Sequence, residues 1–193
     1  GPLLTSVTWS GPFASSVNWT YDASFRPTGE TIPGAGTLTY TYDKDDLVMG
    51  LGGLVITRSA QNGLATGATL GTLVETYGYN VFGEVVSRTF AASGAAVYSA
   101  AYTRDDAGRS AQKQETIGGI TETYVYEYDA MGQLTQVQLN GAEVEEYVYD
   151  TNGNRTSATA SGATTLASFD AHDRLIAAGT TTYTHTPAGK LQG

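Results

Sequence analysis

The sequence of 193 residues contains no cysteine. It therefore has no disulfide framework, no thiolate metal site and no cysteine nucleophile. This absence is compatible with a cytosolic protein and equally with a secreted bacterial one, because large repeat structures need no covalent cross-links. No apolar run approaches the roughly 18–20 residues that cross a bilayer, and no charged-then-apolar leader opens the chain. We therefore expect no membrane span, and no targeting signal is visible.

Positive charge is also scarce. Ten Lys and Arg residues stand against nineteen Asp and Glu residues, which gives a formal net charge of -9. Such a balance argues against binding a phosphate backbone as a main task, because nucleic-acid binding depends on cationic side chains. We expect no nucleic-acid partner.

Large apolar side chains other than Tyr and Trp are few, since Leu, Ile, Val and Phe together make up just under a fifth of the chain. Such a level, combined with high net charge, is typical of disordered chains. However, only 15% of the residues are charged, and the chain contains 13 Tyr and 2 Trp. Tyr, Trp and Thr pack well on a pleated surface, and helical periodicity is nearly absent. The composition therefore favours β-structure, provided that the aromatic residues recur in register.

The aromatic residues do recur, in a short acidic motif such as YTYDKDDL (40–47), YEYDAMGQ (126–133) and YVYDTNGN (147–154). Seven copies align on an Asp or Asn, with spacings of 21, 37, 25, 24, 21 and 20 residues, and a degenerate copy near 186 follows. A period in the low twenties is typical of a stacked array rather than a single globular core. The aligned residues are Asp22, Asp43, Asn80, Asp105, Asp129, Asp150 and Asp170.

The repeats predict a single array over residues 3–193, and Gly1-Pro2 is interpreted as the remnant of an expression tag. The long interval of 37 residues predicts an extra hairpin at about 50–70. It would comprise the strand LVITR (54–58), a turn at QNG (61–63) and a further strand over 68–77.

The tyrosines of each copy alternate with small or β-branched residues, so they share one face of a strand. In Tyr147-Val148-Tyr149, for example, both rings lie on one face and Val148 lies on the other. Rows of such rings on neighbouring strands can form aromatic ladders, with each pair contributing roughly 0.2–1 kcal/mol. The tyrosines of the repeat motif are Tyr21, Tyr40, Tyr42, Tyr77, Tyr79, Tyr102, Tyr126, Tyr128, Tyr147 and Tyr149.

The pattern D-x-x-G after the tyrosines predicts a tight turn. An Asp or Asn at the first position of a type I turn accepts a hydrogen bond from the main-chain N–H two residues on, and Gly at the fourth position adopts a positive φ without strain. This combination is a common hairpin connection. The glycines that fit are Gly83, Gly108, Gly132 and Gly153, and Arg109 follows one of them. The sequence therefore predicts an all-β meander of tandem antiparallel hairpins.

The repeated Y-x-Y-D-x-x-G-R/N motif, interleaved with Thr- and Gly-rich return strands, resembles the YD repeats of Rhs proteins, bacterial toxin complexes and animal teneurins. The resemblance covers roughly residues 17 to 191. It implies a curved or spiralling sheet, as an open fragment of a β-shell or solenoid that often encloses a toxic domain. The family's D-P-x-G self-cleavage motif is not matched, because Thr186-Pro187-Ala188-Gly189 lacks the aspartate. No autoproteolytic residue is therefore carried over.

Several polar groups are candidates for chemical sites. The stretch DTNGN (150–154) offers three side-chain oxygens, but its glycine and the residue at position twelve do not fit a calcium loop of the EF-hand type, so a turn is the preferred interpretation. The acidic group Asp43, Asp45 and Asp46 is interpreted as a solvated hairpin tip. His172 and His185 lie far apart in the array, which disfavours a zinc site. We expect no metal, no cofactor and no enzymatic activity.

We expect a structural segment of a larger bacterial Rhs-type protein, secreted or on the cell surface, whose shell encloses a toxin or effector. The partners would be the rest of the same chain, its enclosed cargo and, for the excised segment, another copy paired edge to edge. A surface adhesion or carbohydrate-binding module that uses the Tyr and Trp rows is the alternative, so a glycan partner stays open.

Overall fold

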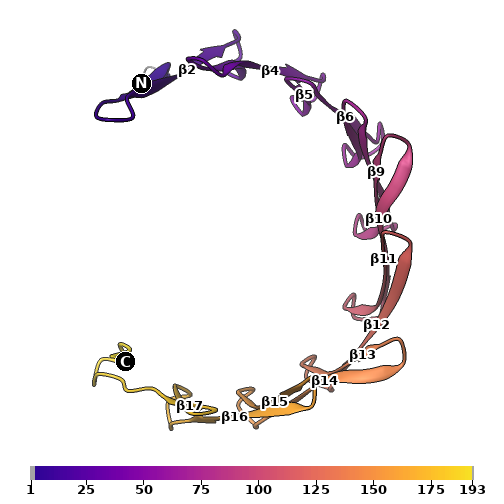
Figure 1. Cartoon of the computed structure of the whole chain (residues 1–193), viewed down its shortest axis with the longest axis vertical. Coiled ribbons are helices and arrows are strands. Elements are labelled where there is room, and N and C mark those ends of the chain that lie inside the picture. Colours follow the sequence, from indigo (N-terminus) through magenta and orange to yellow (C-terminus); the bar gives the residue numbers. More distant parts are fainter. Residues whose placement is uncertain (1–2, 193) are drawn as a thin grey trace. The chain divides into compact units, whose positions relative to one another are not determined.

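The computed structural model describes residues 3–192, so the tag remnant proposed at Gly1-Pro2 lies outside the described residues. The described chain forms 18 strands and no helix (Figure 1). Accordingly, no described segment is a helix long and apolar enough to cross a membrane. The chain divides into two compact units, residues 1–99 and residues 100–193, and β10 (Ala95–Arg104) crosses the boundary between them.

The first unit is an antiparallel meander in which each strand pairs with its neighbours in sequence. Taken by itself, it follows a curve along which the strands succeed one another (Figure 1). Its strands are β1 (Ser6–Trp9), β2 (Ser15–Tyr21), β3 (Pro27–Ile32), β4 (Gly36–Tyr42), β5 (Val48–Leu51), β6 (Leu54–Arg58), β7 (Ala65–Leu70), β8 (Leu73–Tyr79) and β9 (Val85–Ala92).

The second unit repeats this plan of antiparallel neighbours. Its strands after β10 are β11 (Ser110–Ile117), β12 (Ile120–Tyr128), β13 (Leu134–Leu139), β14 (Ala142–Tyr149), β15 (Arg155–Ala160), β16 (Ala163–Phe169), β17 (Leu175–Ala178) and β18 (Thr181–Thr182). The expectation of an all-β chain of antiparallel hairpins is confirmed.

The interval of 37 residues contains the hairpin β6–β7, whose strands are joined by a turn over 59–64. In that turn the Ser59 N–H donates to the Leu64 carbonyl at 2.8 Å and the Gly63 N–H donates to the Ser59 carbonyl at 2.9 Å. The interval therefore contains a diverged copy of the turn, one residue longer than the others. The single strand expected over 68–77 is instead divided by a two-residue turn at Gly71 and Thr72, which separates β7 from β8.

All seven acidic turns have the same main-chain geometry. In the turn at Asp150, the Gly153 N–H donates to the Asp150 carbonyl at 3.1 Å, and the Asp150 N–H donates to the Asn154 carbonyl at 3.0 Å. Oδ1 of Asp150 accepts the N–H of Asn152 and the N–H of Asn154, both at 2.9 Å. The equivalent bonds recur in every other copy, so the first side chain caps two main-chain donors rather than the single one expected.

The fourth turn residue adopts a left-handed conformation whether or not it is glycine. Gly153 has φ 88°, but Phe25, Asp46 and Asp173 also have φ values of 64°, 65° and 58°. Residues with a Cβ disfavour this region, at a cost of roughly 1–2 kcal/mol. The capping hydrogen bonds of the turn therefore impose this conformation on three copies whose sequence does not favour it.

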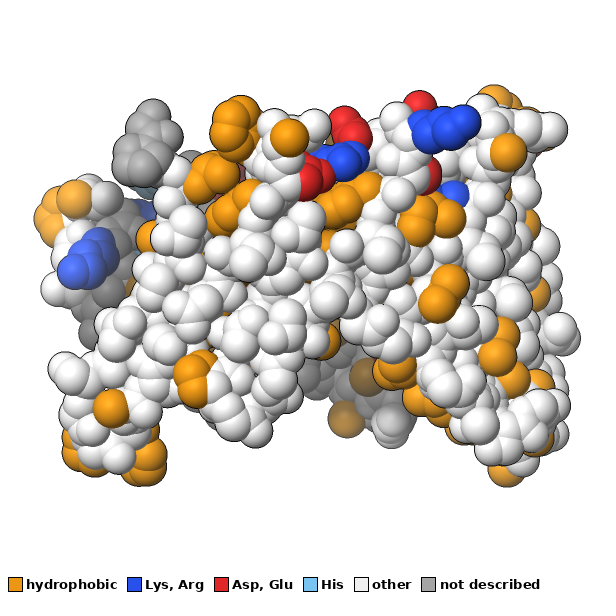
Figure 2. Space-filling view, turned by 90° about the horizontal axis from the view of Figure 1, so that it is seen from above, with side chains coloured by type: hydrophobic (Ala, Val, Ile, Leu, Met, Phe, Trp, Pro, Cys, Tyr) orange, Lys and Arg blue, Asp and Glu red, His pale blue; other side chains and the backbone are white. Residues whose placement is uncertain are grey.

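The described strands form a single layer without a thick core, since the contacts between them join strands that follow one another in sequence. Within residues 3–192 the buried apolar side chains are Ala100 and Val137. The tyrosine-bearing face is half-buried through lateral contacts between its own side chains, whereas the threonines between the tyrosines, such as Thr20 and Thr41, are exposed. Most of the surface visible in Figure 2 is uncharged polar side chain and backbone, with apolar side chains in separate patches.

We predict that Gly153→Val lowers the free energy of unfolding by about 1–2 kcal/mol, because valine is strained at a positive φ. A Cβ at this position would also lie 3.1 Å from Nε2 of Gln133. The neighbouring control Thr151→Ala changes an exposed side chain and is expected to have almost no effect. Chemical denaturation of the two variants measures the difference, and equal midpoints would contradict the turn assignment.

Candidate functional site

In five copies the tyrosine directly before the turn donates a hydrogen bond to an earlier main-chain carbonyl. In four of them the acceptor is the carbonyl of the first strand residue after the preceding turn, at 2.7–2.9 Å, and in the first copy Tyr21 donates to the Leu4 carbonyl, which precedes β1, at 2.7 Å. Tyr42, for example, donates to Pro27, and Tyr149 donates to Leu134. We call this contact the tyrosine clasp. It is formed by Tyr21, Tyr42, Tyr79, Tyr128 and Tyr149.

An arginine at the fifth turn position reinforces the clasp in two places. Nε of Arg26 lies 2.7 Å from Oδ2 of Asp22 in its own turn, and the guanidinium lies over the Tyr42 ring of the next copy, 4.6 Å from its centroid. Arg109 does the same with Asp105 at 2.7 Å and Tyr128 at 4.4 Å. A cation over an aromatic face is attracted by the ring quadrupole. Each arginine thus connects the carboxylate of its own turn with the tyrosine ring of the next copy.

The junction between the turn at Asp43 and the turn at Ser59 replaces both members of this pair. Leu47 occupies the arginine position of the turn at Asp43, and Arg58 occupies the tyrosine position that follows. Nε and Nη2 of Arg58 donate to the Val48 carbonyl at 3.1 and 3.0 Å, and Nη1 donates to the Gly63 carbonyl at 3.0 Å. The Val48 carbonyl is the counterpart of the carbonyl that tyrosine binds elsewhere, so the guanidinium takes over the clasp.

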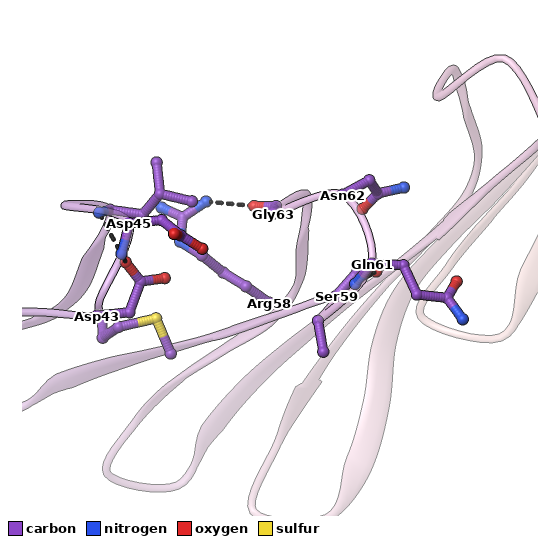
Figure 3. A pocket seen from close by; sticks show the side chains of 10 residues that line it. Asp43, Asp45, Arg58, Ser59, Gln61, Asn62 and Gly63 are labelled. Atoms are coloured by element: carbon purple, nitrogen blue, oxygen red, sulfur yellow. Dashed lines mark hydrogen bonds between the residues drawn. The ribbon is translucent and has the colours of Figure 1, made fainter.

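This altered junction contains a polar pocket of about 340 Å³ (Figure 3). Asp43 and Asp45 line one side, Ser59 and Gln61 line the other, and Arg58 extends between the two turns. Oδ1 of Asp43 caps its own turn, and all three nitrogens of Arg58 donate to carbonyl oxygens. The carboxylate of Asp43 and the guanidinium of Arg58 are thus both engaged with the main chain.

Several tyrosines farther from the turn contact a glutamate. The hydroxyl of Tyr124 donates to Glu122 at 2.8 Å, Tyr147 donates to Glu145, and Tyr40 donates to Glu30 at 3.3 Å. Hydrogen bonds to these carboxylates raise the pKa of Tyr124 and Tyr147, while partial burial is the main cause of the raised pKa of Tyr40, Tyr77 and Tyr126. The hydroxyls of Tyr40, Tyr124 and Tyr147 therefore act as donors to carboxylates.

Four of the turn carboxylates have a lowered pKa, those of Asp22, Asp105, Asp150 and Asp170. The pKa of Asp22 is lowered mainly by the Arg26 N–H, that of Asp150 by the Asn154 amide, and that of Asp170 strongly by the Arg174 guanidinium. Partial burial opposes the shift at Asp105, but hydrogen bonds from Arg109 outweigh it and lower the pKa of Asp105 as well. Strongly capped carboxylates of this kind are structural acceptors rather than general bases.

The residues considered as metal ligands do not converge. Asp46 pairs with Arg26, and the N–H of His172 donates to the carboxylate of Asp170. His185 forms an isolated bridge with Leu191. Among residues 3–192 no group of three or more His, Cys, Asp or Glu side chains is placed to hold a metal ion.

The tyrosine clasp could not be found from the motif alone, because its acceptor is a main-chain carbonyl about 14–18 residues earlier in the sequence. The recurrence of tyrosine directly before the turn was the available signal.

Comparison with known proteins places this repeat in a family. The family model Teneurin YD-shell matches residues 1–192. Human Teneurin-4 is 29% identical over 128 residues, which is 64% of this chain and 5% of that protein. Mouse Teneurin-3 is 36% identical over 83 residues, which is 41% of this chain and 3% of that protein. The chain thus spans about one twentieth or less of the length of these relatives.

Solved structures share the fold. A crystal structure of TcdB2-TccC3 without its hypervariable C-terminal region has a TM-score of 0.72 at 14% identity, covering 91% of this chain and 11% of that chain. A structure described as TcdB2-TccC3-Cdc42 has a TM-score of 0.73 at 14% identity, covering 96% of this chain and 12% of that chain. Both likenesses concern the fold, an open antiparallel sheet of YD-shell type.

We predict that Tyr128→Phe lowers the free energy of unfolding by about 0.5–1.5 kcal/mol, because the Ser110 carbonyl loses its donor. Tyr126→Phe is the matched control on the same strand, since Tyr126 forms none of the clasp hydrogen bonds. Urea denaturation of both variants measures the difference. Equal losses of unfolding free energy in the two variants would show that the clasp hydrogen bond does not contribute to stability.

Proposed function

Because the chain belongs to the Teneurin YD-shell family, we propose that it is a wall segment of a larger shell that encloses a toxin or effector cargo. We further propose that the complete protein is bacterial and acts outside the cell or on its surface. The observation that carries the proposal is the tyrosine clasp, which recurs along the array and joins neighbouring copies where no thick core does so. Such a wall can extend by adding copies, and it acts by steric enclosure.

We propose no catalytic role for this segment. Tyrosine hydroxyls donate to main-chain carbonyls or glutamates, and turn carboxylates cap their own main chain. Chemistry would therefore belong to another part of the longer protein. The partners of this segment are the strands that precede and follow it in that protein, together with the enclosed cargo.

Protection of the cargo from protease tests the proposal on the complete natural protein that contains this segment. Treatment of the folded protein is expected to leave an internal fragment intact, and opening the shell with denaturant is expected to expose that fragment to cleavage. Rapid cleavage of every domain other than the YD repeats, before any denaturant is added, would contradict enclosure.

A carbohydrate-binding role is the second candidate, and Trp9 is the residue that favours it. Trp9 lies on β1 and is 43% exposed, whereas the tyrosine rings are covered by neighbouring side chains or cations. Measuring the binding of this chain to a glycan array distinguishes between the two functions. Saturable sugar binding that is lost in Trp9→Ala would favour adhesion over enclosure.

We also propose that the separate chain associates with a second copy through its edge strand. Within the first unit β1 pairs with β2 alone, and all four of its residues are exposed. An uncovered strand edge is a template for pairing with another chain.

We predict that Val7→Lys on β1 reduces the associated fraction at high protein concentration, because an edge lysine opposes further pairing. Val55→Lys is the matched control: Val55 is similarly exposed, but its strand β6 is paired on both sides. Light scattering gives the mass of each variant. A strictly monomeric parent chain, or equal association of the two variants, would contradict edge pairing.

A further inference from the structure

Three turns of the chain contain an asparagine followed by a glycine, at Asn62-Gly63, Asn140-Gly141 and Asn152-Gly153. Asparagine is one of the thermolabile residues of proteins. Its side-chain amide reacts with the main-chain nitrogen of the next residue, because the two groups close a five-membered ring. Glycine hinders this ring closure least, since it has no side chain. The pair is the same at all three sites, so the surrounding structure decides which of them reacts first.

Two of the three glycine nitrogens are held by hydrogen bonds within their turns. The Gly63 N–H donates to the Ser59 carbonyl at 2.9 Å, and the Gly153 N–H donates to the Asp150 carbonyl at 3.1 Å. Both glycines are half-buried. The nitrogen must lose its proton when it attacks the amide, so each of these hydrogen bonds must first be broken, at a cost in free energy.

The pair Asn140-Gly141 lies in a different kind of turn, the two-residue connection between β13 and β14. Both residues are exposed, and their φ values are 52° and 83°. Among residues 3–192 no main-chain or side-chain acceptor takes a hydrogen bond from the Gly141 N–H. The proton on this nitrogen is therefore accessible to hydroxide.

The side-chain amide of Asn140 is polarised by the neighbouring strand β12. Its Oδ1 accepts the Thr123 N–H at 2.9 Å, while the Asn140 N–H donates to the Thr123 carbonyl at 2.8 Å. An N–H donor at an amide oxygen stabilises the negative charge that develops there when a nucleophile adds to the carbon. The turn thus combines an unbound attacking nitrogen with an activated amide.

The other two asparagines lack this combination. Oδ1 of Asn62 accepts the Leu64 N–H at 3.1 Å, but the attacking nitrogen of that pair is bound. At Asn152 the attacking nitrogen is bound as well, and the amide nitrogen Nδ2 donates to Oδ1 of Asp173 at 2.9 Å. Both ends of the reaction are therefore restrained at Asn152.

We propose that Asn140 is a site of spontaneous deamidation, and that in the folded chain it reacts before Asn62 and Asn152. The Gly141 nitrogen adds to Cγ of Asn140. The bond between this nitrogen and Cγ forms, the bond between Cγ and Nδ2 breaks, and the Gly141 proton leaves with the amide nitrogen as ammonia. Water then opens the cyclic imide at either of its two carbonyl carbons. The products are aspartate and isoaspartate, in which the main chain passes through Cγ.

The reaction alters a turn that has little room for change. Leu139 and Ala142 are paired directly on either side of the turn, and isoaspartate adds a methylene group to the main chain between them. The two hydrogen bonds between Asn140 and Thr123 continue the β12–β13 ladder into this turn. Isoaspartate is expected to weaken that attachment, and either product adds one negative charge to a chain whose net charge is -9.

Incubation of the folded chain at mildly alkaline pH tests the proposal, because hydroxide removes the attacking proton. Cleavage after Glu127 and Glu143 releases Asn140 in a different peptide from Asn62 and Asn152. Mass spectrometry then follows each site through the change in mass from amide to acid. Asn140 is expected to react roughly two- to tenfold faster than the other two sites, which is the effect of one hydrogen bond on the attacking nitrogen. In urea the three rates should converge, because the unfolded sites share the same pair of residues.

Asn140→Gln removes the reactive site, since glutamine closes its larger ring much more slowly, and it should abolish the acidic form that appears first on ion exchange. Asn152→Gln is the matched control and should leave that form unchanged. The proposal is overturned if Asn62 or Asn152 reacts as fast as Asn140 in the folded chain, or if Asn140 stays intact there while the unfolded chain reacts. Persistence of the first acidic form in Asn140→Gln would also overturn it.

Discussion

A sheet that is one layer thick has no interior, and this constraint governs the rest of the molecule. Burial of large apolar side chains, the main stabilising contribution in most domains, is almost absent here, since Ala100 and Val137 are the buried apolar side chains of the described residues. Stability must come from contacts within the plane of the sheet. Main-chain ladders, the tyrosine clasp and the capped turns are those contacts, and each of them joins a strand to its neighbour in sequence.

The constraint also explains which substitutions the repeat tolerates. Leu47 and Arg58 replace the arginine–tyrosine pair at one junction. The Val48 carbonyl still accepts a hydrogen bond there, from the guanidinium of Arg58 instead of a tyrosine hydroxyl. Asn80 caps its turn as Asp does, with Oδ1 accepting the N–H groups of Phe82 and Glu84 at 3.0 Å. Thr186 does the same for the degenerate copy, where Oγ1 accepts the Lys190 N–H at 3.0 Å. At these positions the repeat therefore keeps a hydrogen-bond donor or acceptor, whereas the residue type changes.

The fold class followed from the sequence because the two strongest local signals agree. Alternation of tyrosine with threonine predicts strands, whose side chains have a period of two. Asp with Gly three residues later predicts the turns between these strands. The sequence predicted these features at Asp105–Gly108 and Asp150–Gly153. It could not predict that Phe25 and Asp46 adopt the same left-handed conformation, because the capping hydrogen bonds of the turn override the preference of the residue at its fourth position. The division of the segment 68–77 at Gly71 was missed for a related reason, since one glycine inside an apolar run is a weak turn signal.

The candidate site was less accessible to sequence reasoning than the fold. Clasp acceptors are main-chain carbonyls, which carry no residue signature, and the bridging of Asp22 and Asp46 by Arg26 joins residues 20 to 24 positions apart. Only the structure shows that the fourth residue of one turn contacts the fifth residue of the previous turn. The residue types at these two positions of the repeat therefore indicate which side chains meet at each junction.

The clasp has a further consequence for how the array comes apart. Because every clasp reaches only to the preceding copy, the free energy of each unit is close to a sum of intrinsic and nearest-neighbour contributions, as in a one-dimensional chain. Melting in such a chain starts at the weakest junction and spreads from there. Phe169 and His185 stand at the clasp positions of the last two copies and carry no phenolic hydroxyl. The second unit should therefore fray from β16–β18 while β11–β14 are still paired, and hydrogen exchange along the chain would follow that gradient.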